Sequence, residues 1–230
     1  MNQNQLNQFE RIISLVGEEK YKSIKNKNIL VVGIGGVGGY VVESLIRSGI
    51  ESITIVDYDT IDLTNLNRQI LALHSTIGMK KVDVMKKRIL DINPNCKVNT
   101  FDIKIDSNNY SMIFKEKYDY IIDCCDSVEA KKTLILESVK SNIPIISSMG
   151  TANRFDPTKL EILDIRKTIN DPLARKIRKF VKDAKINKKI MVLSSKEVPM
   201  KNGVKLGSNS YVPPCAGLII SSYVLNDIVK

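Results

Sequence analysis

The sequence has few histidines and cysteines, the residues that form most zinc sites. His74 is the only histidine in 230 residues, so a site built from several histidines is excluded. The four cysteines are Cys96, Cys124, Cys125 and Cys215, and no two of them form a C-x-x-C pair. Neither structural zinc nor a redox dithiol is therefore indicated. We expect reduced, packed thiols of a cytosolic protein, with Cys124 and Cys125 inside an apolar strand.

Long apolar segments are also missing. The N-terminus, MNQNQLNQFERIISL, is polar and has no signal-peptide core, and no stretch reaches the roughly 18 apolar residues of a membrane span. Serines and Asp227 interrupt the last apolar segment, AGLIISSYVLNDIVK, which we expect to be a docked helix. With 43% hydrophobic residues the chain can bury an ordinary core. These features predict a cytoplasmic protein without a membrane partner.

The first 150 residues show strands of the buried type alternating with amphipathic helices. After a helix over residues 9–24, the predicted strands are NILVVG, SITIVD, KVNTFDI, YDYIIDCCD and IPIISSMG. The predicted helices between them cover residues 37–47, 80–92, 108–115 and 128–141. This order predicts an α/β fold with a doubly wound, Rossmann-like, mainly parallel sheet.

The pattern changes after residue 150. Two strand-like pieces, KLEILDI and KIMVLSS, flank a basic helix, and the loop MKNGVKLGSN follows. We therefore expect three parts: an N-terminal helical segment (1–26), a nucleotide-binding domain (27–150) and a C-terminal α+β extension (151–230). We expect the extension to complete the domain and to carry the surface that binds the substrate.

The loop after the first predicted strand, GIGGVGG, has the glycine spacing that seats a pyrophosphate on a helix N-terminus. Gly33 permits a tight turn, Gly35 lets backbone N–H groups approach phosphate, and Gly38 allows helix and strand to pack closely. Asp57 ends the second predicted strand, 19 residues after Gly38, where a carboxylate would bind a ribose hydroxyl. These residues favour nucleotide binding, but they do not choose between NAD and ATP.

The segment DYDTIDLTNLNRQ favours ATP. Asn65 and Arg68 are three residues apart, which puts two side chains on one face of a helical turn. Lys81 begins the next predicted helix, and Asp126 stands where the fourth strand ends. Arginine and lysine would offset phosphate charge, and an acid at the strand tip could hold magnesium. This set resembles an ATP site built for attack at the α-phosphate.

Each of these residues also has a plainer explanation. Asp59 or Asn65 could cap a helical turn, Asp126 could be the N-cap of the helix near residue 128, and Lys81 could lie on a solvated face. Arg68 is the hardest to explain otherwise, because a lone basic residue within NLNRQI has little other purpose.

GIGGVG, DYDTIDLTNLNRQ, GMKKV and DCCDS together resemble the ubiquitin-activating-enzyme superfamily, in its ThiF/MoeB/HesA branch, whose members adenylate a carboxylate. LNRQI, KTINDPLARKIRK, VLSSKEVP and GSNSYVPP are similar to the tRNA threonylcarbamoyladenosine dehydratase (TcdA/CsdL) family. The resemblance runs from about Phe9 to the C-terminus. It implies that ATP and Mg²⁺ activate the threonine carboxylate of N6-threonylcarbamoyladenosine at position 37 of tRNA. Ring closure would then release AMP without a protein nucleophile.

The resemblance assigns most of the candidate residues to one ATP site. These residues are Gly33, Gly35, Gly36, Gly38, Asp57, Asp59, Asn65, Arg68, Lys81 and Asp126. Arg68, Lys81 and Asp126 would act at the triphosphate, with Asp126 near the magnesium. Arg11 matches an arginine that reaches the partner's ATP across a homodimer, although it could also be an ordinary surface residue. The apolar stripe of the N-terminal helix likewise favours a homodimer.

Two other functions stay open. The first is activation of the C-terminal glycine of a small sulfur-carrier protein, and by resemblance a sulfur-transfer or sulfur-acceptor protein could be a partner. The protein-activating members usually carry two C-x-x-C zinc pairs, which this sequence lacks, and nothing marks Cys215 as a nucleophile. The second is an NAD-binding oxidoreductase or regulatory module, against which Asn65, Arg68 and Lys81 argue.

The net charge of +10 is unevenly distributed. Residues 165–189 hold ten Lys or Arg against two Asp, a local charge of +8. Asp171 and Pro172 predict a helix start, and Leu173, Ile177, Phe180 and Val181 would form its core-facing stripe. The remaining positions carry the basic residues Arg175, Lys176, Arg178, Lys179 and Lys182. They form either a solvated basic face or a ridge that binds phosphates of the anticodon arm.

Overall fold

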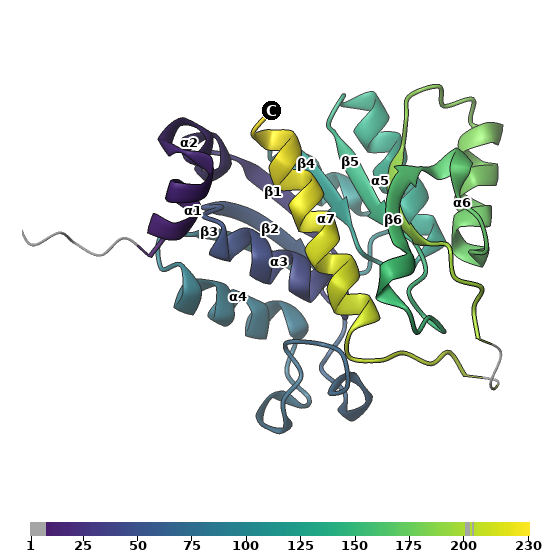
Figure 1. The fold of residues 1–230 in the computed structure, drawn as a ribbon, viewed down its shortest axis with the longest axis horizontal. Coiled ribbons are helices and arrows are strands. Elements are labelled where there is room, and N and C mark those ends of the chain that lie inside the picture. The colour runs from purple at the N-terminus through teal and green to yellow at the C-terminus, as the bar shows by residue number, and fades with distance from the viewer. Residues whose placement is uncertain (1–7, 201–202, 204) are drawn as a thin grey trace, which may run out of the picture.

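A seven-stranded sheet forms the centre of the computed structural model, which describes residues 8–200, 203 and 205–230. Its strand order is β3-β2-β1-β4-β5-β7-β6 (Figure 1). The strands are β1 (Asn28–Val32), β2 (Ser52–Val56), β3 (Lys97–Phe101), β4 (Tyr120–Asp123), β5 (Ile145–Ser148), β6 (Leu160–Asp164) and β7 (Met191–Ser195). All neighbours pair in parallel except β6 and β7. The predicted doubly wound α/β fold is confirmed.

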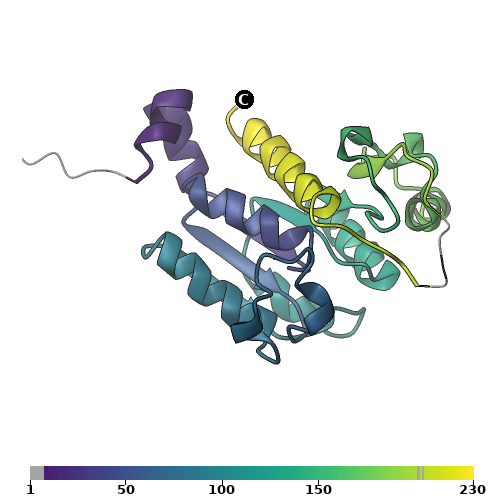
Figure 2. The same ribbon diagram turned by 60° about the horizontal axis from the view of Figure 1, so that its bottom comes forward.

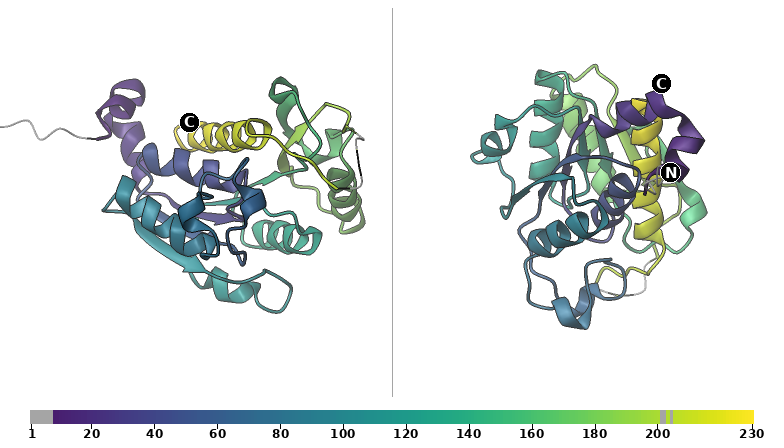
Figure 3. Two further views of the ribbon diagram at one scale, coloured as in Figure 1. Left: turned by 90° about the horizontal axis from the view of Figure 1, so that it is seen from below. Right: turned by 90° about the vertical axis from the view of Figure 1, so that its left-hand side faces the viewer.

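Helices cover both faces of the sheet (Figures 2 and 3). One face packs against α3 (Gly38–Arg47), α4 (Lys81–Ile92) and α7 (Val212–Ile228). The other face packs against α5 (Val128–Lys140) and α6 (Pro172–Asp183). None of the helices in the described part of the chain is long and apolar enough to cross a membrane.

Strand β1 is apolar from Ile29 to Val32 because both of its faces are buried. In β1, Ile29 and Val31 point into the core under α3, whereas Leu30 and Val32 point into the core under α5. All four side chains are at most 3% exposed. This burial on both faces is typical of a parallel sheet covered by crossover helices.

Two predicted helices differ from the structure. The helix expected over residues 9–24 is divided into α1 (Glu10–Val16) and α2 (Glu18–Lys25). Gly17 lies between them with a φ of +85°, a conformation that favours glycine and turns the chain. The helix expected over residues 108–115 is instead a 3₁₀ segment, Tyr110–Lys115, which has a kink at Phe114 where the backbone leaves helical geometry.

The placement of Cys124 and Cys125 in a strand was wrong. β4 ends at Asp123, whose carboxylate accepts a hydrogen bond from the Cys125 N–H at 3.2 Å and so turns the chain away from the sheet. All four cysteines are free thiols. Cys96 is buried, whereas the other three are half-buried.

Candidate functional site

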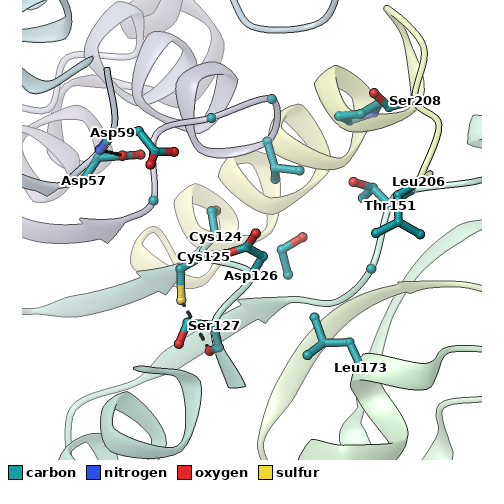
Figure 4. Close-up of a pocket in the computed structure, with 18 of the residues that line it drawn as sticks. Asp57, Asp59, Cys124, Cys125, Asp126, Ser127, Thr151, Leu173, Leu206 and Ser208 are labelled. Carbon is teal, nitrogen blue, oxygen red and sulfur yellow. Dashed lines mark hydrogen bonds between the residues drawn. The ribbon is translucent and has the colours of Figure 1, made fainter. Parts of the chain in front are cut away.

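A cavity of about 920 Å³ opens at the carboxyl ends of the central parallel strands. Loops that follow β1, β2, β4 and β5 line it, and the strand order reverses between β1 and β4. Ligands of doubly wound sheets bind at such a reversal. Figure 4 shows Asp57 and Asp59 toward one end of this cavity, Thr151, Leu206 and Ser208 toward the other, and Asp126 between them. We call these ends the nucleotide half and the outer half.

The glycine loop leaves no room for side chains at its two ends. Gly33 has a φ of +81°, and a Cβ there would lie 2.8 Å from the carbonyl carbon of Cys124. A Cβ at Gly38 would lie 1.8 Å from the carbonyl oxygen of Gly33. Gly35 and Gly36 line the cavity, and no acceptor among the described residues bonds to their N–H groups. These N–H groups are available to a phosphate.

Asp57 connects the glycine loop to the segment after β2. Its carboxylate accepts hydrogen bonds from the N–H groups of Ile34 at 2.8 Å and Asp59 at 2.9 Å. The side chain lines the nucleotide half although the residue is only 8% exposed. Burial raises the pKa of Asp57, and the nearby ammonium of Lys81 opposes this shift. The carboxylate keeps lone pairs that ribose hydroxyls can use.

Lys81 is not on a solvated face. Its side chain is only 5% exposed, and its ammonium lies 2.7 Å from the Asp59 carboxylate. The Lys81 N–H also donates to the Asp59 carbonyl at 3.1 Å, which fixes the start of α4 beside this acid. Both side chains line the cavity. The ion pair therefore holds a positive charge in a defined place in the cavity wall.

Asn65 and Arg68 both line the cavity, as the three-residue spacing predicts. Asn65 ends the 3₁₀ turn Leu63–Asn65, and its Oδ1 accepts from the Asp62 N–H at 3.2 Å, so it also caps this turn. The Arg68 Nη1 donates to the Thr64 carbonyl at 2.8 Å and to the Asn67 Oδ1 at 2.9 Å. Its Nε and Nη2 have no hydrogen-bond partner within the described chain, which leaves them for a ligand.

Asp126 is exposed in the cavity, in the turn between β4 and α5. The N-cap of α5 is Ser127, whose hydroxyl accepts from the Ala130 N–H at 3.3 Å, so Asp126 is free of that role. No group of three or more potential metal ligands occurs in the described segments. Mg²⁺ is usually bound by one or two carboxylates together with phosphate oxygens. Asp126 beside a nucleotide phosphate fits that pattern.

Several residues of the cavity were missed at the level of sequence. In the nucleotide half these include Gln69, whose buried Oε1 has no partner among the described residues, and Lys104, whose ammonium lies 5.6 Å from the ring centre of Tyr58. In the outer half they include Thr151 and Arg154. Thr151 could have been found, because it follows β5 at the edge where β4 places Asp126. Gln69 could also have been found, because it ends the segment DYDTIDLTNLNRQ. No sequence signal identifies Lys104 or Arg154.

The predicted tRNA-binding residues lie on α6, which begins as predicted. The Asp171 carboxylate accepts from the N–H groups of Leu173 and Ala174, and Pro172 follows as the first helical residue. Arg175, Lys176, Lys179 and Lys182 are exposed. Arg178 is half-buried and donates to the carbonyl and the hydroxyl of Thr168, so it is less available to an external phosphate. Lys176 lines the outer half of the cavity.

Arg11 is exposed on α1 and is not among the residues that line the cavity. Figure 1 shows α1 and α2 at the end of the sheet away from the start of α3, where the glycine loop lies. An action of Arg11 at an ATP site would therefore require a second copy of the chain.

A sequence model of the ThiF family matches residues 9–196. A protein of Bacillus subtilis (strain 168) named tRNA threonylcarbamoyladenosine dehydratase is 40% identical, over 98% of this chain and 96% of that protein. Crystal structures of the E. coli tRNA N6-threonylcarbamoyladenosine dehydratase, TcdA, in complex with AMP and with ATP both have a TM-score of 0.91 to this structure. Their sequence identities are 34% and 35%, and each match covers 96% of this chain and 93% of the other. This chain therefore belongs to the ThiF family.

Proposed function

We propose that this protein is an ATP-dependent tRNA threonylcarbamoyladenosine dehydratase that cyclises the modified nucleoside at position 37. The observation that carries the proposal is that one continuous cavity contains both the nucleotide half and the outer half. One half has the glycine loop and ribose acid of a nucleotide site, and the other half adjoins the basic helix α6 through Lys176. Relatives that align over nearly the whole chain carry this activity in their names.

In the nucleotide half, the N–H groups of Gly35 and Gly36 bind phosphate oxygens, and Asp57 accepts hydrogen bonds from the ribose. Arg68 and Lys81 offset the charge that develops as pyrophosphate leaves. Asn65 lies beside Arg68 and lines the same wall. Asp126 would hold Mg²⁺, which supplies further neutralisation of phosphate charge when bound.

The reaction has two steps. An oxygen of the threonine carboxylate attacks the α-phosphorus, the bond to the leaving pyrophosphate breaks, and an acyl-adenylate forms. A group on the carbamoyl side of the same modification then attacks the activated carbonyl carbon, closes the ring, loses one proton and expels AMP. The net change to the nucleoside is the loss of one water. Because ring closure is intramolecular, positioning in the cavity supplies much of its acceleration.

The other functions lack a specific observation in their favour. Activation of a sulfur-carrier protein would use the same nucleotide half, but the basic face of α6 beside the outer half fits tRNA phosphates better than a protein C-terminus. A sulfur-transfer or sulfur-acceptor partner stays an expectation from the family alone. For an NAD oxidoreductase, Arg68 and Lys81 supply more positive charge than a dinucleotide requires.

The assembly that we propose is a homodimer in the cytoplasm. α1 and α2 stand at one end of the sheet, and the side chain of Leu15 on α1 is 79% exposed. Two-fold oligomers are the commonest kind, and a contact through α1 would carry Arg11 to the second copy. In that contact Arg11 would reach the ATP site of the partner.

The test is a reaction with purified protein, ATP, Mg²⁺ and tRNA that carries N6-threonylcarbamoyladenosine. We expect stoichiometric release of pyrophosphate and AMP, together with loss of one water from the modified nucleoside by mass spectrometry. The same tRNA without the modification is the control and should release no pyrophosphate. Unchanged nucleoside mass, with pyrophosphate released only on addition of a small sulfur-carrier protein, would instead establish the alternative.

A further inference from the structure

A fully buried ion pair lies beneath the cavity floor. The ammonium of Lys131 on α5 lies 3.0 Å from the Asp123 carboxylate at the end of β4, and both side chains are 0% exposed. Asp123 does not line the cavity, and neither residue takes part in the reaction as proposed above. Burial acts to lower the pKa of Lys131, but the interactions with Asp123, Cys125 and Cys124 together outweigh it, and the pKa lies above its ordinary value. The ammonium form of Lys131 is therefore favoured beside Asp123.

This pair is bonded to the ends of two neighbouring strands. The Lys131 ammonium also donates to the Ser148 carbonyl at 2.7 Å and to the Ser147 hydroxyl at 3.2 Å, both at the end of β5. The Asp123 Oδ1 accepts from the N–H of Cys125 at 3.2 Å and from its thiol at 3.0 Å. The Ser147 hydroxyl donates to the Asp123 Oδ2, which closes the cluster.

The loops that follow β4 and β5 line different parts of the cavity. Residues 124–127 bring Asp126 to the middle of the cavity, where the nucleotide phosphates would lie. Residues 148–151 bring Thr151 to the outer half. The spacing between the two loops therefore sets the gap that the attacking carboxylate must cross. In-line attack tolerates little error in that gap.

We infer that Lys131 is a positioning residue for adenylation, which acts by locking the loop of Asp126 and the loop of Thr151 together through Asp123 and Ser148. This inference rests on the proposed function for its kinetic readout, but not for its structural readout. A buried ion pair is weak evidence for stability in itself, because an uncharged replacement often folds as well. Stability and positioning can therefore be separated by mutation.

The experiment compares three variants of the full chain. Lys131→Met leaves the Asp123 carboxylate buried without a counter-ion, and Asp123→Asn/Lys131→Met removes both charges. Lys140→Met is the matched control, because it makes the same substitution on the same helix at a side chain that is 74% exposed. Melting temperature, the kcat and KM for ATP in pyrophosphate release, and hydrogen exchange of residues 124–127 and 148–151 are measured for each.

We expect Lys131→Met to melt well below the wild type, and the charge-free double variant to recover most of that loss. Both should nevertheless lose roughly 10²-fold in kcat, the scale for a small misplacement of reacting groups, with little change in the KM for ATP. Hydrogen exchange should quicken in both loops of both variants, and Lys140→Met should match the wild type throughout.

Wild-type kcat in the charge-free variant, or wild-type exchange in its two loops, would overturn the positioning role. If the wild type itself releases no pyrophosphate with modified tRNA, the proposed function fails, and hydrogen exchange alone decides whether Lys131 locks the loops. The two failures are thus distinguishable.

Discussion

Arg68 and Lys81 are held in the cavity by contacts within the protein. Asp59 holds the ammonium of Lys81 at 2.7 Å, and two oxygens hold Nη1 of Arg68 while its other nitrogens stay available. Cations placed before the substrate arrives need no reorganisation as charge develops on the leaving pyrophosphate. The two residues differ in that the Lys81 side chain is buried and paired with the half-exposed Asp59, whereas Arg68 has a free edge toward the ligand.

Arg68→Ala should lower turnover by roughly 10²–10³, the scale for losing one charge contact made in the transition state. ATP with Mg²⁺ should bind to the wild type, and NAD(H) should not. Stopped-flow or steady-state pyrophosphate release gives the turnover, and calorimetry gives the nucleotide affinities. Arg47→Ala, on the surface of α3, is the control and should behave as the wild type. Near-wild-type turnover of the Arg68 variant would remove Arg68 from the mechanism.

The cysteines give a prediction about pH. Burial raises the pKa of Cys96 to about 12, and burial also raises the pKa of Cys124 and Cys125, with Asp123 adding to the effect in both. The native thiols therefore stay protonated at pH 8, and because the thiolate is the nucleophile, iodoacetamide should label these three slowly until the protein unfolds. Fast native labelling of Cys125 at pH 8, read by mass spectrometry, would point to a nucleophilic cysteine and a sulfur-transfer reaction.

The raised pKa values of these thiols also determine whether the stability of the fold rises or falls with pH. A thiol whose pKa is higher in the folded than in the unfolded chain contributes stability that is complete below the ordinary value of about 8.5 and is lost as pH rises toward the folded value. The melting temperature should therefore fall between pH 8 and pH 10. Cys96→Ala should show a shallower fall than the wild type over this range.

At the scale of elements, apolar patterns and cap residues were the reliable predictors. The run NILVV predicts a strand buried on both faces, and β1 has this environment because its neighbours are parallel. The pair Asp171 and Pro172 predicts the start of α6 within one residue. The long N-terminal helix failed because its apolar spacing continues across Gly17, and only the local backbone conformation reveals the break.

The part of the candidate site that lies within one short stretch of the sequence was predictable. The glycine loop and Asp57 follow successive strands, so their spacing along the chain reflects their geometry. The outer half was not predictable, because Thr151, Lys176 and Ser208 come from three separate segments that only the folded chain brings together. Lys131 was missed for a related reason. A lysine on an amphipathic helix indicates the surface, and its partner Asp123 belongs to another element.

Helix α6 presents Lys176 to the cavity, whereas Arg175 and Lys179 lie outside the cavity lining. This difference predicts different effects of their substitution. Reversing Arg175, Lys176 and Lys179 to Glu should weaken tRNA binding and flatten its salt dependence, because fewer counterions are released, while ATP affinity stays intact. Among single variants, Lys179→Ala should mainly reduce tRNA affinity. Lys176→Ala should also reduce turnover at saturating tRNA, because Lys176 alone of the three lines the cavity.

Filter binding across a salt series measures the affinity, and single-turnover pyrophosphate release measures the chemistry. An unchanged salt slope in the triple variant would leave α6 as a solvated basic face. Equal turnover of the Lys176 and Lys179 variants at saturating tRNA would remove Lys176 from the outer half of the site.

At the scale of the whole molecule, the cavity and the N-terminal helices α1 and α2 lie at opposite ends of the sheet. The cavity lies at the carboxyl ends of the strands, whereas α1 and α2 lie at the other end, next to the start of β1 (Figure 1). No conformational change within a compact domain would bring Arg11 on α1 to the glycine loop of its own chain. A two-fold dimer can bring each α1 to the cavity of the other copy.

Mixed dimers test this arrangement. Arg11→Ala leaves its own cavity intact but supplies no arginine to the partner, whereas Arg68→Ala has an impaired cavity and an intact Arg11. We expect each variant alone to be nearly inactive. Because a heterodimer isolated by two affinity tags has one complete site of two, we expect it to recover about half of the wild-type activity.

Sedimentation analysis at micromolar concentration gives the oligomeric state of each sample before the assay. The control mixes Arg68→Ala with Lys81→Ala, two variants impaired in the same cavity, and should recover nothing. A wild type that sediments as a monomer with full activity would refute the dimer. A dimer in which Arg11→Ala alone is fully active would keep the dimer and refute the role of Arg11.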